Sequence, residues 1–236
     1  YFPVSVEPTP NTSGQVRDRE ELELIHKLVS QGMAGIIVDS CANEESPIWR
    51  QLQQLDIPVL CFNNSGSGAG NLDCVSANNY QGGVLAAERL LVTGRRAPVI
   101  VSDPFDGSSS VRDRIRGFIE TMREAGVEVA PDAIIPCAEL LDGKGTDDAA
   151  AGRFRAADAV FGINDGMAII AMKFLQRTGR QIPADVAVIG FDDSELCEHV
   201  TPRLDSVRQA SAHMGRRAAE LLLERIENPA NRADTI

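Results

Sequence analysis

Two polar turns, each placed directly after a short apolar run, are the parts of this sequence best suited to binding chemistry. Asn164 and Asp165 follow the apolar residues 159–163, and Asp192 and Asp193 follow the apolar run that ends at Gly190. A carboxylate accepts hydrogen bonds from two neighbouring hydroxyls, and an amide side chain both donates and accepts. If both runs are strands of one open parallel sheet, the turns lie at its carboxyl edge, where such sheets bind ligands. The pattern predicts a site for a small polar molecule.

These four side chains also have plainer explanations. Asp192 suits a turn or a helix cap, and Asp193 suits the cap better. Asn164 is a common turn residue before a helix, with Asp165 as the capping residue. Local sequence alone leaves these alternatives open.

A serine-rich turn followed by an arginine forms a second candidate group. Ser108 and Ser110 stand between the apolar residues 97–101 and an expected helix over residues 111–125. Serine hydroxyls and unpaired backbone N–H groups at a helix start bind polar ligands well, although plain N-capping explains the serines equally. Arg114 carries a rigid fork of donors that binds two ligand oxygens at once. Its alternative is a surface arginine on that helix.

Motifs for catalysis, cofactors or metals fail in spacing or context. The glycine-rich stretch 66–70 follows a strand, but the third glycine of a dinucleotide loop would fall at Asn71, and no helix follows directly. Residues 143–146 lack the first glycine of a phosphate-binding loop, and no Gly-x-Ser-x-Gly elbow is present. The histidines are scattered without metal-like spacing: His26, His199 and His213. We therefore expect no catalytic residue, no cofactor and no metal.

Composition narrows the class of protein further. The 236 residues are 43% hydrophobic, enough for a sizeable core, and carry a net charge of -11. That acidic balance opposes direct DNA contact, which needs clustered Lys and Arg. Five cysteines, an odd number without a CxxC pair, fit reduced thiols and a cytoplasmic location. No apolar run reaches the roughly 18 residues of a membrane helix.

Strand and helix patterns alternate along the chain, which predicts an α/β fold with parallel sheets covered on both faces. Residues 138–157 are polar and Ala-rich, and their pattern leaves them unassigned to helix or strand. The expected strands are residues 2–6, 35–39, 57–62, 74–76, 97–101, 133–135, 159–163 and 186–190. The expected helices are residues 19–31, 47–55, 80–91, 111–125, 166–178 and 211–226.

Three stretches carry a family resemblance: Asp158-Ala-Val-Phe-Gly-Ile-Asn-Asp-Gly-Met167, Ile182-Pro-Ala-Asp-Val-Ala-Val-Ile-Gly-Phe-Asp-Asp193 and Thr201-Pro-Arg-Leu-Asp-Ser-Val-Arg-Gln209. They resemble the effector-binding core of LacI/GalR family transcription regulators. This implies two doubly wound parallel-sheet lobes joined by hinge crossovers, as in type I periplasmic binding proteins, with the N-terminal part truncated. Lobe one would be residues 1–76 plus 209–236, and lobe two residues 77–208.

The resemblance also assigns ligand-binding positions. The family pattern of a small polar residue, three spacers and Arg-x-x-Gly-aromatic is matched by Arg114-Ile-Arg-Gly-Phe118, with serines four and six residues before the arginine. The family places its ligand-binding acid first in the Asp-Asp pair, and often has a ligand-contacting Asp or Asn where Asn63 stands, with Asn64 as the alternative. Gln209 matches a position that touches ligand in some relatives. The implied site is Asn63 in lobe one with Ser108, Ser110, Arg114, Asn164 and Asp192 in lobe two.

The resemblance implies a sensor of a small polar effector, a sugar or sugar derivative. Ligand would close the two lobes and change the DNA affinity of a separate helix-turn-helix head. A homodimer is expected, with contacts on residues 19–31, 47–55 and 80–91, and with Trp49 as an anchor if it is exposed. One alternative is a periplasmic sugar-binding protein of a transporter, which has the same fold. Another is an α/β enzyme such as a dehydrogenase.

Overall fold

The computed structural model describes residues 14–64, 70–103, 107–141 and 149–228. The chain divides into two compact units. Unit 1 comprises Tyr1–Ala77, Phe105–Ser110 and Ser211–Ile236, and unit 2 comprises Asn78–Pro104 and Val111–Ala210. The serine turn therefore groups with unit 1, whereas the family resemblance implies that it belongs to lobe two.

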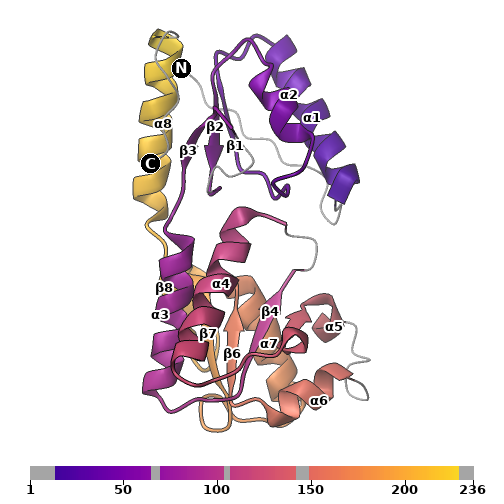
Figure 1. Ribbon diagram of the computed structural model, residues 1–236, viewed down its shortest axis with the longest axis vertical. Helices are drawn as coiled ribbons and strands as arrows, with labels where there is room; N and C mark the ends of the chain where they lie inside the picture. The colour runs from indigo at the N-terminus through magenta and orange to yellow at the C-terminus, as the bar shows by residue number, and fades with distance from the viewer. Residues whose placement is uncertain (1–13, 65–69, 104–106, 142–148, 229–236) are drawn as a thin grey trace. The chain divides into compact units, whose positions relative to one another are not determined.

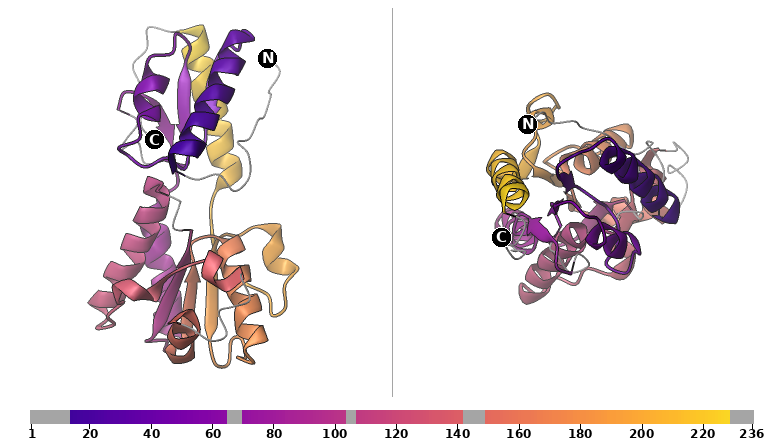
Figure 2. Two further views of the ribbon diagram at one scale, coloured as in Figure 1. Left: turned by 90° about the vertical axis from the view of Figure 1, so that its right-hand side faces the viewer. Right: turned by 90° about the horizontal axis from the view of Figure 1, so that it is seen from above.

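Unit 1 is built on a three-stranded parallel sheet in the order β1-β2-β3. The strands are β1 (Ile36–Val38), β2 (Val59–Phe62) and β3 (Asp73–Val75), and the helices are α1 (Gly14–Ser30), α2 (Ile48–Gln53) and α8 (Ser211–Glu227). Side chains alternate across the strands, so each face has its own core. Helices α1 and α2 cover one face and α8 covers the other (Figures 1 and 2).

A buried ion pair fastens α8 to the sheet of unit 1. The Arg225 Nε and Nη2 atoms donate to the two carboxylate oxygens of Asp73 at 2.8 and 3.0 Å, and both side chains are almost fully enclosed. Bidentate pairing of this kind is the strong geometry for an arginine and a carboxylate. It ties the C-terminal helix to β3.

Unit 2 is built on a five-stranded parallel sheet in the order β5-β4-β6-β7-β8. The strands are β4 (Pro98–Ser102), β5 (Ile134–Pro136), β6 (Ala159–Gly162), β7 (Ala187–Asp192) and β8 (Asp205–Arg208). The helices are α3 (Asn79–Val92), α4 (Ser109–Glu124), α5 (Ala138–Leu141), α6 (Ala149–Ala156) and α7 (Asp165–Arg177), with 3₁₀ turns at Pro131–Ala133 and Glu195–Glu198. The first two residues of α4 belong to unit 1.

Helices cover both faces of the unit 2 sheet. One core contains side chains of α3 and α4, and the other contains side chains of α5, α6 and α7 (Figure 1). Burial on both faces explains why β4 and β6 read as continuous apolar runs. Helices α3 and α4 approach so closely that a Cβ on Gly83 would lie 2.0 Å from the Arg114 carbonyl oxygen, which only glycine permits.

The predicted α/β fold with parallel sheets is confirmed, and most element boundaries agree within two residues. Strand β8 was missed, and α5 and α6 lie in residues 138–157, which the sequence pattern left unassigned. The predicted strand over residues 2–6 lies outside the described residues. Trp49 is not exposed: it is buried in the unit 1 core, and its indole N–H donates to the Asn43 carbonyl at 2.7 Å.

No disulfide joins any of the five cysteines, all of which lie within the described residues. Among the helices that the structure describes, none combines the length and apolar character needed to cross a bilayer.

Candidate functional site

The carboxyl edge of the unit 2 sheet gathers three of the residues that the sequence singled out. Strands β6 and β7 are parallel neighbours, so their carboxyl ends lie side by side. Asn164 follows the end of β6, and Asp192 is the last residue of β7. Arg114 reaches the same edge from α4.

Arg114 is held in place by contacts at the ends of both strands. Its Nε donates to Asn79 Oδ1 at 2.8 Å, and its Nη1 donates to the Ile163 carbonyl at 2.8 Å. The guanidinium carbon lies 3.7 Å from the centroid of the Phe191 ring, a close cation–π contact. Only 4% of Arg114 is exposed, so the surface-arginine alternative is wrong. The arginine is fixed beside the neighbours of Ile163 and Phe191 in the chain, Asn164 and Asp192.

Asp192 has an unusual backbone and a raised pKa. Its φ of 115° lies in the region that favours glycine, and the next residue, Asp193, has φ 54°. Burial is the main cause that raises the pKa of the Asp192 carboxyl from 3.8 to about 6. The positive charge of Arg114 lowers this pKa, and the negative charge of Asp165 raises it further. At neutral pH the group is therefore mostly a carboxylate, ready to accept hydrogen bonds from hydroxyls.

Asn164 and its neighbours divide the capping roles differently from the expectation. Asn164 is the N-cap of α7, and its Oδ1 accepts from the Met167 N–H at 2.8 Å. Asp165 is not that cap but the first residue of the helix. Asp193 caps no helix either: its Oδ2 pairs with the Arg208 Nε at 2.6 Å, which leaves Asp192 as the acid at the sheet edge.

The remaining predicted residues lie in unit 1. Ser108 and Ser110 are buried, with 3.0 Å between their hydroxyl oxygens, and Ser109 Oγ donates to Asn64 Oδ1 at 3.1 Å. This bond brings the serine turn beside the end of β2, where Asn63 has φ 54° and donates its N–H to the Val75 carbonyl. Unit 1 therefore has a polar cluster of its own.

Sequence reasoning missed the residues that hold Arg114 and Asp192. Asn79 follows another asparagine at a helix start and looks like part of a cap, while Phe191 looks like an ordinary core residue of a strand. Their roles depend on contacts between distant segments, which local periodicity does not register. Gln209 lies close to the site, because its backbone N–H reaches the Asp192 carbonyl at 3.4 Å.

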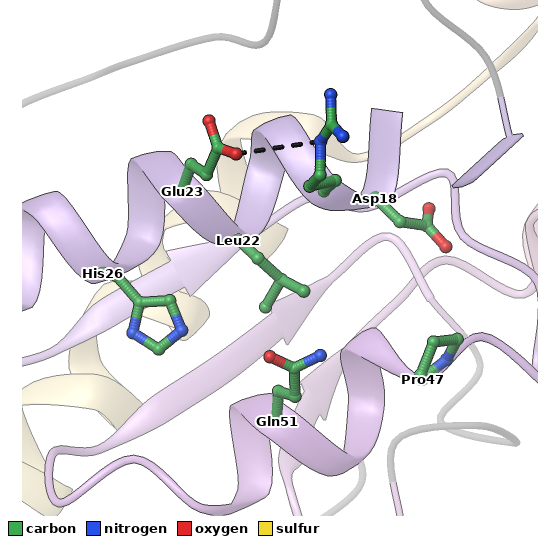
Figure 3. Close-up of a pocket in the computed structure, with 7 residues that line it drawn as sticks. Asp18, Leu22, Glu23, His26, Pro47 and Gln51 are labelled. Atoms are coloured by element: carbon green, nitrogen blue, oxygen red, sulfur yellow. Dashed lines mark ion pairs between the residues drawn. The ribbon is translucent and has the colours of Figure 1, made fainter. Parts of the chain in front are cut away.

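A pocket of about 530 Å³ lies elsewhere, between α1 and α2 of unit 1 (Figure 3). Asp18, Leu22, Glu23 and His26 line it from α1, and Gln51 lines it from α2 together with Pro47, the N-cap of that helix. It contains none of the predicted site residues. Within the described ranges, no cluster of three or more His, Cys, Asp or Glu side chains is arranged to hold a metal ion.

Known proteins similar to this chain are transcription regulators. Residues 87–236 match the family of periplasmic binding protein-like domains, which is more than half of the chain. The chain is 31% identical over 211 residues to the HTH-type transcriptional regulator CelR of Thermobifida fusca, covering 84% of the chain and 58% of CelR. It is 33% identical over 218 residues to the HTH-type transcriptional repressor PurR of Vibrio cholerae, covering 89% of the chain and 62% of PurR.

The fold agrees with these sequence matches. The solved structure of a transcriptional regulator CelR–cellobiose complex superposes with a TM-score of 0.79 at 28% identity, covering 92% of the chain and 67% of that structure. The chain spans about six-tenths of the length of the two curated relatives. The chain therefore belongs to the family of periplasmic binding protein-like domains, and it is similar to members of that family that are transcription regulators.

Proposed function

We propose that this chain is the effector-sensing domain of a LacI-type transcription regulator and that it binds a sugar or sugar derivative. The observation that carries the proposal is the fixed Arg114 guanidinium between the ends of β6 and β7, next to the raised-pKa carboxyl of Asp192. A planar donor beside a carboxylate suits a molecule rich in hydroxyls, because hydroxyl groups both accept and donate. The similarity to a regulator solved with cellobiose supports a sugar.

Each residue at the edge has a distinct role in the proposal. Arg114 donates to ligand oxygens, and Asp192 accepts from two neighbouring hydroxyls. Asn164 uses its oxygen to cap α7, so its amide N–H group is what it offers to the ligand. For unit 1 we propose Asn63, Ser108 and Ser110 as further effector contacts, each to be tested by single substitution.

Regulation of DNA is proposed to act through a separate helix-turn-helix head. The chain itself carries a net charge of -11, which disfavours direct contact with phosphates. The similar relatives are named as HTH-type regulators, which favours this proposal over a transporter's sugar-binding protein and over an enzyme. Cytoplasmic location is part of the same proposal, supported by five cysteines that form no disulfide.

Titration calorimetry with cellobiose, ribose and a panel of other mono- and disaccharides tests the sugar proposal. Asp192→Ala should weaken binding at least tenfold, because a charge-assisted hydrogen bond contributes about 1.5–3 kcal/mol. Asp193→Ala is the matched control: it removes the neighbouring carboxylate, which pairs with Arg208 instead, and should change affinity less than threefold. If Asp193→Ala has the larger effect, or if no sugar binds, the proposed role of this edge fails.

We further propose a homodimer, since two heads would match two operator half-sites. Two described surfaces support it. Leu85 and Val92 lie seven residues apart on α3 and are both exposed, Val92 by 83%. The pocket of Figure 3 is lined by residues of α1 and α2, the other two helices expected to form the contact. Light scattering at tens of micromolar should give a dimer, and Val92→Asp should weaken it. A monomer under these conditions would favour the transporter-type protein.

A further inference from the structure

The acidic turn at the end of β7 adopts a backbone that needs support. Asp192 has φ 115° and Asp193 has φ 54°, and side chains other than glycine rarely occupy either value. A residue in such a conformation persists only when its surroundings over-determine it. The contacts of the two amides that follow Asp192 reveal what supports the turn.

Both of those amides are tied to one buried carboxylate, that of Asp165. The Ser194 N–H donates to Asp165 Oδ2 at 2.7 Å. The Asp193 N–H donates to Ser206 Oγ at 2.9 Å, and the Ser206 hydroxyl donates to Asp165 Oδ1 at 2.6 Å. One bond is direct and the other passes through a hydroxyl on β8, so Asp165 fixes the turn from two sides.

The fold makes room for this buried carboxylate beside β7, and helix capping does not account for it. Asp165 is 2% exposed. A Cβ on Gly190 would lie 2.4 Å from Asp165 Oδ1, so β7 admits the carboxylate only because it carries glycine there. The N-cap of α7 is provided by Asn164, so capping does not account for Asp165.

We infer that Asp165 is a positioning residue that holds the backbone of residues 192–194 so that the Asp192 carboxylate stays at the ligand-binding edge, with Ser206 as its relay. This rests on the proposed function of Asp192 as a ligand contact. Asp165 itself touches no ligand. Its effect on binding passes through Asp192 and disappears when the Asp192 carboxylate is absent.

The test compares Asp165→Asn, Ser206→Ala and Ser206→Thr in the full chain. Asp165→Asn keeps the size of the side chain but removes one acceptor and the charge, and Ser206→Thr keeps the relay hydroxyl. By NMR hydrogen exchange, the Asp193 and Ser194 amides should exchange at least tenfold faster in Asp165→Asn, and the Asp193 amide should do so in Ser206→Ala. Ser206→Thr should restore slow exchange, while the amides of β4 and β6 stay unchanged in all three.

Calorimetry with cellobiose provides the second readout. Asp165→Asn and Ser206→Ala should each weaken binding about tenfold or more, and Ser206→Thr should stay within threefold. In an Asp192→Ala background, adding Asp165→Asn should change affinity less than twofold, because the group that it positions is gone. An equal loss in both backgrounds overturns the inference, as does unaltered exchange at both amides.

The two proposals fail in different ways. If the unsubstituted chain does not bind cellobiose, the sugar proposal fails for that ligand, while the exchange rates still decide whether Asp165 holds the turn. If Asp165→Asn does not fold, Ser206→Ala and Ser206→Thr carry the same comparison, since they change only the relay.

Discussion

Effector binding should weaken on the order of tenfold when the pH falls from 7 to 5. The perturbation acts on Asp192, whose pKa burial raises to about 6. A carboxyl with this pKa is about nine-tenths ionised at pH 7 and about one-tenth ionised at pH 5. Because only the carboxylate accepts from two hydroxyls, binding is present above the pKa and lost as the pH falls through it.

Isothermal titration at pH 5, 6, 7 and 8 with one sugar measures this profile. Asp192→Asn is the control: it should bind more weakly at every pH and show a flat profile over this range. If the unsubstituted chain binds the sugar with constant affinity from pH 5 to pH 8, the prediction is wrong. The Asp192 carboxyl would then either titrate outside this pH range or make no contact with the sugar.

The same raised pKa predicts an opposite trend for stability. The folded chain holds the Asp192 proton more tightly than the unfolded chain, whose carboxyl has the ordinary value of 3.8. The contribution of the protonated Asp192 carboxyl to the unfolding free energy is therefore fully present below about pH 4 and is lost as the pH rises through about 6. Asp192→Asn should raise the melting temperature at pH 7.5 but not at pH 4. The ionised form of Asp192 is thus the one that binds the effector, whereas the protonated form is the one that stabilises the fold.

Three further predictions follow from packing. Arg114→Ala should abolish measurable sugar binding and also lower the unfolding free energy by about 2–4 kcal/mol, because two acceptors lose a charged donor; denaturant titration showing no loss would contradict this. Gly83→Ala should lower the unfolding free energy by about 1–3 kcal/mol, because the new Cβ would clash with backbone atoms of α4. Gly215→Ala on α8 is the control: its Cβ would meet open space, so the substitution should raise the unfolding free energy by up to about 1 kcal/mol. Asp73→Ala should lower the unfolding free energy by about 3–5 kcal/mol, because it removes the buried carboxylate that pairs with Arg225. A thermal shift equal to that of a surface substitution would contradict this.

The parts of the fold that follow from local pattern were predictable from sequence. Apolar runs followed by polar turns located β6 and β7 and placed Asn164 and Asp192 near the ends of these strands. Strand β8 was missed because an edge strand buries little: its sequence Asp-Ser-Val-Arg has polar residues at both ends and lacks the apolar run of its neighbours.

The supports of the site were not predictable, because each depends on contacts between distant segments. Arg114 stands in a stretch of charged residues that reads as a solvated helix face, yet it is enclosed by Asn79 of α3 and Phe191 of β7. Asp165 looked like a helix cap, but a neighbour takes that role and its carboxylate turns toward β8. Local propensity ranks capping residues, whereas the sheet order decides which distant amide a carboxylate meets.

The bond between Asp73 and Arg225 joins residues 152 positions apart, and this separation has a consequence for synthesis on the ribosome. Strand β3 emerges early, but the face of its sheet carrying Leu60 and Val75 has no cover until α8 is made. Unit 2, in contrast, is complete by Ala210. Since domains generally fold as units during translation, unit 2 should fold first and unit 1 should fold only after α8 has been made. A nascent chain halted before α8 would expose an apolar sheet face, and chaperones bind exposed apolar surfaces of this kind.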